Sequence, residues 1–279
     1  METKKLLRVF VASWLAFIAI TAVLPVRASA QSQIVNAQLT TRQATRDLDA
    51  EIQSVAAQGG AAWVAYRVST VRGPQHMCNS NNWTSTRVML EPATELTILV
   101  RVENRAIERL QTVTPDCEVD AGGLPVVWLD GISAAQSAAW LAAQIKSTAT
   151  PNNGKSKIVD SALRALIWHP GDEPLNTVVA LARDDRRTYV RGQALFWLAQ
   201  RAGQQAVGAI RTAVDSDPET EVKRKAVFAL SQLPKDEGVP LLIDVARNNS
   251  NREVRKQAMF WLGQSKDPRA ISFFEQILK

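Results

Sequence analysis

A short phrase recurs three times in the C-terminal half of the chain, at a fixed interval of 32 residues. It reads QALFWLAQ from Gln193, KAVFALSQ from Lys225 and QAMFWLGQ from Gln257. Counted from the valine three residues before each phrase, apolar residues return at offsets of 4, 7 and 8, which share one face of an α-helix. A second apolar stretch follows each phrase. Because one pair of helices cannot bury such a face alone, the interval predicts a solenoid of stacked helical pairs.

A weaker fourth unit precedes these three. Its first position is Ile158, in phase with Val190, Val222 and Val254. All four units have alanine at offset 4 and leucine at offset 8: Ala162, Ala194, Ala226, Ala258, Leu166, Leu198, Leu230 and Leu262. We therefore expect an all-α solenoid of four helical pairs over residues 157–279.

The segments EVKRKAVFALSQLPKDEGVPLLIDVA and EVRKQAMFWLGQSKDPRAISFFEQIL resemble the short HEAT repeats of bacterial proteins of the phycobilin-lyase-like type. The resemblance covers residues 158–279, although the first unit has Val159 where the others have Arg or Lys. It implies that the helices opening with Val-Arg line the concave face of a curved solenoid. It also implies that the basic residue pairs with an acid near the preceding turn, a ladder that we interpret as structural. The acids available are Asp184, Asp185, Asp215 and Asp217.

Phenylalanine and glutamine recur within the phrase on the side away from the expected core. The residues are Phe196, Phe228, Phe260, Gln200, Gln232 and Gln264. Trp197 and Trp261, one position after a phenylalanine, fall on the expected buried face. Two interpretations of the phenylalanines stay open. Each packs against the neighbouring repeat, or a Phe stripe edged with amides binds a partner peptide on the concave face.

The first 30 residues have the layout of a secretory signal. A basic start is followed by an uncharged apolar run over residues 9–24, and Ala28-Ser29-Ala30 supplies the small residues of a cleavage site. Cleavage would leave Gln31 at the N-terminus. The alternative is an uncleaved membrane anchor, because the run of 16 residues comes close to the ~17–25 of a spanning helix. We expect a periplasmic or secreted protein, with membrane contact only through an uncleaved signal segment.

The charge of the chain does not favour a nucleic-acid partner. The formal net charge is +6, from 33 basic and 27 acidic residues. Removing residues 1–30 takes away four basic residues and one acid, which leaves 29 and 26, or +3. This excess is spread along the chain without a long Lys/Arg run, so we expect no nucleic acid among the partners.

Residues 31–146 predict a small α+β domain. The spacing of four apolar residues favours a helix over residues 36–57. Strand patterns follow at residues 61–70, 95–104, 106–113 and 124–129, with a weaker one at 87–90. A short turn at Asn104-Arg105 should join the second and third strands as a hairpin. A helix should begin at Ser133 with a capping box. We expect a small antiparallel sheet with one or two helices.

The two cysteines, Cys78 and Cys117, predict a disulfide, because an exported chain folds in an oxidising compartment. The alternative is a soft metal site built from His76-Met77-Cys78 together with Cys117. We favour the disulfide and expect neither a metal nor another cofactor. The stretch STATPNNGKS at residues 147–156 has the composition of a linker, and we place the domain boundary there.

The sequence lacks the residue patterns of common catalytic sites, such as G-x-S-x-G, H-E-x-x-H, a P-loop or a dinucleotide-binding glycine motif. His169, near a helix end where a cation suits the dipole, is interpreted as structural. We therefore expect a non-enzymatic adaptor that binds a protein or peptide of the cell envelope through the concave face of the solenoid. The alternatives are an enzyme or enzyme accessory subunit of the envelope, as in the lyase branch of the family, and a structural envelope component. The oligomeric state is not predicted.

Overall fold

The computed structural model describes residues 34–71, 77–78, 91–148, 156–201 and 203–278. The chain divides into two compact units, Met1–Gln31 and Ser32–Lys279, and the fold below is that of the second. The predicted signal segment with Ala28 and Ala30, the weak strand at 87–90 and His76 lie outside the described residues. Within the described ranges, no helix combines the length and the apolar character needed to cross a bilayer.

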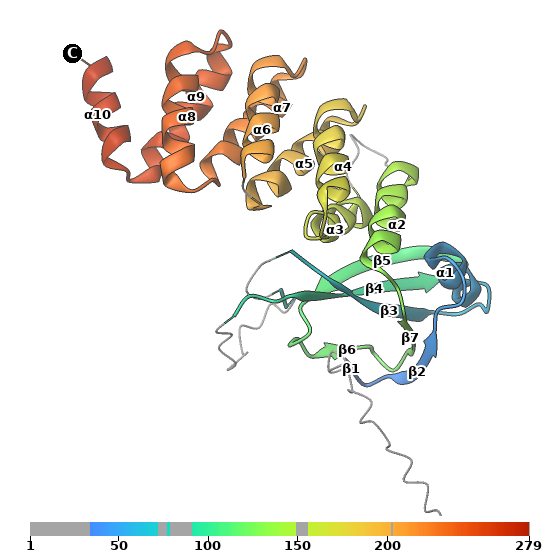
Figure 1. The fold of residues 1–279 in the computed structure, drawn as a ribbon. Coiled ribbons are helices and arrows are strands. Elements are labelled where there is room, and N and C mark those ends of the chain that lie inside the picture. Colours follow the sequence, from blue (N-terminus) through green and yellow to red (C-terminus); the bar gives the residue numbers. More distant parts are fainter. Residues whose placement is uncertain (1–33, 72–76, 79–90, 149–155, 202, 279) are drawn as a thin grey trace, which may run out of the picture. The chain divides into compact units, whose positions relative to one another are not determined.

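The described residues ahead of the helical part form seven strands (Figure 1). Their bounds are β1 Ile34–Val35, β2 Gln38–Gln43, β3 Ala62–Ser69, β4 Glu95–Glu103, β5 Ala106–Val113, β6 Val119–Asp120 and β7 Pro125–Asp130. The larger sheet has the strand order β2-β7-β3-β4-β5, and β1 pairs with β6 in a small parallel sheet. An α+β region followed by a run of helices is therefore confirmed.

The larger sheet is mixed, which corrects the expectation of an antiparallel sheet. β3 and β5 are both antiparallel to β4, but β7 lies between β2 and β3 and runs parallel to both. Parallel strands need a crossover connection, and helix α1 (Leu48–Ala56) supplies it between β2 and β3. The alternation within a strand does not encode which neighbour the strand takes, so the sequence pattern could not show this order.

The predicted hairpin is confirmed. β4 and β5 pair antiparallel around Asn104 and Arg105, which both take positive φ values, 52° and 63°. Every second residue of β4 from Leu96 to Val102 is buried, as the alternation predicts. Thr97 and Leu99 between them are buried as well, and Leu99 belongs to a second core on the other face of the sheet. The hairpin thus places β5 at one edge of the described sheet.

The predicted helix over residues 36–57 is wrong in its first half. Residues 38–43 form strand β2, and the helix begins only after Asp47, whose side chain caps it by accepting a hydrogen bond from the Ala50 N–H at 2.9 Å. Leu39, which we counted as part of the helical spacing, is 43% exposed on this strand. Its apolar side chain therefore carried no information about a buried helix face.

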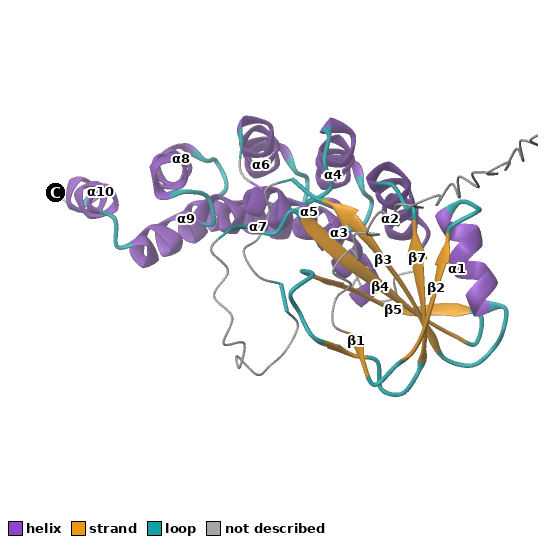
Figure 2. Ribbon diagram, turned by 60° about the horizontal axis from the view of Figure 1, so that its bottom comes forward, coloured by secondary structure: helices purple, strands orange, loops and turns teal. Residues whose placement is uncertain are grey.

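The chain continues as nine described helices in two layers (Figure 2). They are α2 Ala134–Ser147, α3 Lys157–Leu166, α4 Asp172–Asp184, α5 Thr188–Arg201, α6 Gln204–Ser216, α7 Thr220–Ser231, α8 Lys235–Asn248, α9 Arg252–Ser265 and α10 Pro268–Ile277. One layer holds α3, α5, α7 and α9, and the other holds the even-numbered helices. Contacts between successive helices are more extensive in the first layer, so we term it the inner layer and the second the outer layer. The expected capping box opens α2.

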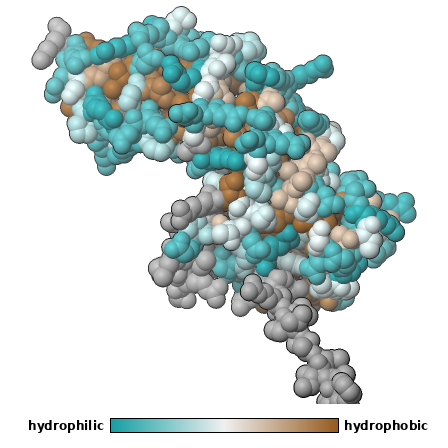
Figure 3. All heavy atoms as spheres, in the orientation of Figure 1, coloured by the Kyte–Doolittle hydropathy of each residue, from teal (hydrophilic) through white to brown (hydrophobic). Residues whose placement is uncertain are grey.

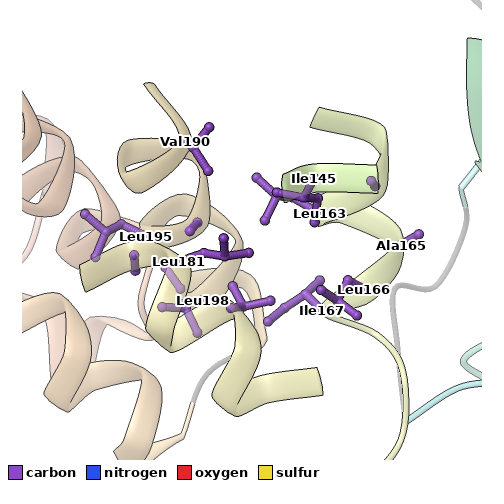
Figure 4. Packing of buried hydrophobic residues seen from close by; sticks show 14 of the residues in the cluster. Ile145, Leu163, Ala165, Leu166, Ile167, Leu181, Val190, Leu195 and Leu198 are labelled. Atoms are coloured by element: carbon purple, nitrogen blue, oxygen red, sulfur yellow. The ribbon is translucent and has the colours of Figure 1, made fainter. Parts of the chain in front are cut away.

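The repeat positions form the core of the helical part. The alanines at offset 4 and the leucines at offset 8 are at most 1% exposed in all four units. Figure 4 shows Leu195 and Leu198 of α5 within the same packed cluster as Leu181 of α4 and Leu163 of α3. Burial of this one face in every unit is the physical reason for the repeated phrase.

The hydrophobic core does not divide at the predicted boundary between residues 147 and 156. Helix α2 packs against α3, and Figure 4 shows Ile145 of α2 beside Leu163 of α3. Both belong to a cluster that also includes Ile98 of the sheet. Arg187, just before α5, donates hydrogen bonds to the carbonyl groups of Ile145 (2.9 Å) and Thr148 (3.3 Å). Helix α2 therefore serves as the first outer-layer helix as well as a cover for the sheet, and residues 149–155 lie outside the described residues.

Candidate partner-binding surface

The phenylalanines form a continuous row of aromatic rings with the two tryptophans. Phe196 stacks on Phe228 with ring centres 6.0 Å apart and an interplanar angle of 2°. Trp261 lies 4.9 Å from Phe228 and 5.0 Å from Phe260, and Trp197 lies 5.0 Å from Phe196. Aromatic pairs attract one another at these separations. These five residues, from α5, α7 and α9, are termed the aromatic row.

The exposure of the aromatic row increases toward the C-terminal end of the solenoid. Phe196 and Phe228 are partly buried, whereas Phe260 is 54% exposed. The stacking of Phe196 on Phe228 joins two repeats, so these two rings do pack between repeats. They nevertheless keep part of their surface accessible, and Phe260 presents most of its ring. The two interpretations of the Phe stripe are therefore compatible with each other.

The two tryptophans are less buried than the sequence predicted. We placed Trp197 and Trp261 in the core, but both are only partly buried. Offset 7 lies beside the centre of the buried face, and an indole ring is too large to fit there completely. The indole Nε1–H of each is buried without an acceptor among the described residues. A buried N–H group without an acceptor costs about 1–3 kcal/mol, so an acceptor supplied by a bound partner would make a favourable hydrogen bond there.

The three glutamines that follow the phenylalanines are exposed. Gln232 and Gln264 line a hollow of about 480 Å³ together with Trp261, at the C-terminal ends of α7 and α9. Gln200 is not among the residues that line this hollow. The side-chain amides can both donate and accept hydrogen bonds, as the backbone of a bound chain requires.

Charged side chains lie one helical turn before two phenylalanines of the row, because Arg224 stands four residues before Phe228 on α7 and Lys256 four residues before Phe260 on α9. Arg224 pairs with Glu221 at 3.4 Å, and Lys256 pairs with Glu253 at 3.1 Å. Arg224 also donates from Nε to Oε1 of Gln257 at 3.4 Å. Exposed pairs of this kind contribute only about 0–1 kcal/mol to stability. They therefore form a polar rim that a partner can engage at little cost to the fold.

The outer layer has a hollow of a different kind. It measures about 320 Å³, lies between α4 and α6, and has small residues such as Gly208 and Ala209 in its lining. Figure 3 shows that the viewed face of the helical part is mostly hydrophilic, with hydrophobic residues showing between the helices. The residues that line this hollow include no aromatic side chain.

The basic residue after the repeat valine pairs differently from what the family resemblance implies. Arg191 binds Asp217 through two hydrogen bonds, Nε to Oδ2 at 2.8 Å and Nη2 to Oδ1 at 3.0 Å. Asp217 belongs to the turn after the next helix rather than to the preceding turn. The preceding turn contributes only a backbone group, the carbonyl of Asp185, at 2.8 Å from Nη1. Both side chains of the pair are buried, so we interpret this pair as structural.

A buried hydrogen-bonded chain joins the sheet to the helices, and no sequence pattern predicted it. The Ser137 hydroxyl lies 3.1 Å from the Tyr66 hydroxyl and 2.9 Å from Nε2 of His169. Nδ1 of His169 lies 2.9 Å from the Ala165 carbonyl, which can only accept, so Nδ1 carries the proton and Nε2 accepts from Ser137. Burial lowers the pKa of His169. The ring is therefore neutral, which corrects our expectation of a cation at this helix end.

The contact between Ser137 and His169 has the distance of a nucleophile and its base. Both residues are completely buried, however, and no substrate can reach the hydroxyl without opening the core. Four hollows found among the described residues are lined by other residues. We therefore interpret this pair as structural, in line with the sequence interpretation of His169.

The cysteines form the expected disulfide between Cys78 and Cys117. These two residues and Asp116 also make the one group of potential metal ligands in the described part of the chain. Both sulfur atoms belong to the disulfide, so neither can serve as a thiolate ligand. The disulfide closes the second, smaller core, which lies on the other face of the sheet with Trp128 and Leu99.

Position 164 is a further residue of this surface that our sequence interpretation passed over. Arg164 on α3 stands 32 residues before Phe196, so it takes the position that phenylalanine holds in the next three units. It lines a hollow of about 390 Å³ with Trp197 and with residues of strand β5. The repeat interval itself was the signal, because it places an arginine in line with the Phe stripe.

The repeat pattern also has a match among known families. Residues 175–259 and 209–279 match the model for HEAT repeats. Residues 175–279 carry HEAT repeats. The match confirms the resemblance seen in the sequence and begins within α4, the second helix of the weak first unit. The region before it has no family match, and the chain has no match among curated proteins.

Proposed function

We propose that this protein is a scaffold that binds a segment of a partner protein along the inner layer of its HEAT repeats. The observation that carries the proposal is the aromatic row, which ends in a largely exposed Phe260 and is bordered by exposed amides and weak ion pairs. Interfaces concentrate their binding energy in aromatic anchors surrounded by a polar rim. HEAT repeats generally present an extended concave surface for this purpose.

We further propose that the protein acts outside the cytoplasm, in the periplasm or as a secreted protein, on a partner of the cell envelope. Support comes from the signal-like layout of residues 1–30 and from the disulfide between Cys78 and Cys117. N-terminal mass spectrometry of the exported protein should find Gln31 as the first residue. A chain that retains Met1 and needs detergent for extraction would contradict cleavage.

Cross-linking capture from envelope extracts tests the binding surface. Wild-type protein and Phe260→Ala should be compared, with Ile271→Ala as the matched control. Ile271 is a similarly exposed apolar residue, at 57%, but it lies on α10 outside the aromatic row. We expect Phe260→Ala to reduce capture of a specific partner about tenfold, as loss of a ~1–2 kcal/mol anchor does, while Ile271→Ala leaves it unchanged. Equal capture by all three proteins would exclude the aromatic row as the binding surface.

A further inference from the structure

The first unit breaks the aromatic pattern with a cation. Arg164 replaces phenylalanine at the stripe position, and its Nη2 donates to the Thr112 carbonyl of β5 at 3.4 Å. Its Nε–H is buried without an acceptor among the described residues. Because α3 packs against β5, the guanidinium group lies where the inner layer meets the edge of the sheet.

The hollow around Arg164 is positively charged. Arg109 of β5 and Lys157 of α3 also line it, and both are exposed. Asp160 is the one acid in its lining, so the charge of the lining residues is three minus one, or +2. Oδ2 of Asp160 already accepts a hydrogen bond from the Tyr189 hydroxyl at 2.6 Å. Oδ1 of Asp160 is buried without a donor among the described residues, so the hollow combines an excess of positive charge with one unpaired acceptor.

The aromatic row begins at the same hollow. Trp197 lines it and is also in contact with Phe196, the first phenylalanine of the row. Strand β5 packs on α3 at this end of the inner layer. An extended chain that lies along the aromatic row toward α3 would therefore meet β5 and end at the hollow.

We propose that this hollow binds the free C-terminal carboxylate of a partner chain whose preceding apolar side chains lie on the aromatic row. The proposal rests on the proposed function and specifies the chemistry of its partner. A terminal carboxylate matches the planar donor group of an arginine and would supply the acceptor that Nε of Arg164 lacks. Burial also lowers the pKa of Arg164, an effect that a bound carboxylate would oppose.

Peptide arrays with matched ends test this proposal. Random octapeptides ending in leucine are made with a free C-terminal carboxylate and, in identical sequence, with a C-terminal amide. The purified protein should bind its preferred sequences at least about tenfold more tightly with a free C-terminal carboxylate than with a C-terminal amide, the gain expected from a charged hydrogen-bonded contact. Arg164→Gln should remove that preference. Lys157→Gln, at an exposed position, should weaken it without risk to the fold, and Arg211→Gln on the outer layer is the control.

Each outcome decides a different question. The carboxylate proposal is overturned if the wild type binds acids and amides equally, or if it binds no free-acid peptide. It is also overturned if the preference for acids survives both Arg164→Gln and Lys157→Gln. The proposed function is judged separately, by the capture experiment with Phe260→Ala. If Phe260→Ala weakens acids and amides equally while Arg164→Gln affects only acids, both proposals are supported.

Discussion

Truncation of the aromatic row should produce two different results at its middle and at its end. Phe228 is partly buried and contacts two rings, Phe196 and Trp261. Phe260 is more than half exposed and contacts one ring, Trp261. Phe228→Ala and Phe260→Ala therefore remove the same atoms from environments that differ in burial and in the number of aromatic partners.

The expected magnitudes follow from these environments. Truncation of a completely buried phenylalanine costs about 3–5 kcal/mol, and each aromatic pair contributes about 0.5–1.5 kcal/mol beyond burial. Phe228 is incompletely buried but loses two pairs, so we expect a loss of about 2–3 kcal/mol in the free energy of unfolding. For Phe260 we expect about 1 kcal/mol, because its exposed surface contributes nothing to the fold.

Chemical denaturation of the two variants and the wild type measures both losses in the free energy of unfolding, and the capture assay measures binding to the partner in parallel. Phe260→Ala should lose more free energy of binding than free energy of unfolding, whereas Phe228→Ala should lose both. Leu198→Ala, at a completely buried core position, serves as a packing control, with an expected loss of at least 2 kcal/mol in unfolding free energy. A Phe260→Ala variant destabilised as strongly as Phe228→Ala would refute the assignment of Phe260 to an exposed anchor.

Three further predictions concern the structural framework. Burial lowers the folded-state pKa of His169, so the free energy of unfolding should fall as the pH drops below ~6.5, where the unfolded state takes up the proton. Denaturation curves of His169→Gln should lack this loss between about pH 6.5 and 5. Asp217→Asn should cost about 3–5 kcal/mol, since it removes the carboxylate that pairs with buried Arg191, and calorimetry showing a loss below 1 kcal/mol would contradict this. Reduction of the disulfide between Cys78 and Cys117, which are 39 residues apart, should lower the free energy of unfolding by about 4 kcal/mol. Because the core is continuous, the reduced protein should unfold in one shared transition rather than lose the sheet alone.

The repeat interval determined much of the helical part without any tertiary information. Its apolar positions must be buried in every unit, so Ala194 and Leu198 could be assigned to the core from their phase alone. The same holds for local features, since a turn at Asn104-Arg105 or a cap at Ser133 depends only on adjacent residues. The disulfide was predictable for a different reason, because the sequence offers only one pair of cysteines.

The tertiary structure decided the features that join distant parts of the chain. The insertion of β7 between β2 and β3, the pairing of Arg191 with Asp217, and the use of α2 as an outer-layer helix all depend on which surfaces meet. A local pattern shows that a face is apolar or that a side chain is charged, but it does not show which partner covers or neutralises it.

The candidate site also combines features that the sequence determined with features that the tertiary structure decided. The phase of the repeat placed Phe196, Phe228 and Phe260 on one face, and it also placed Arg164 in line with them. Only the packing of α3 against β5 showed that Arg164 lies where the inner layer meets the sheet, and only ring geometry showed that the tryptophans complete the row. Periodicity fixes direction around a helix, whereas the distance between two side chains is fixed by how their helices pack.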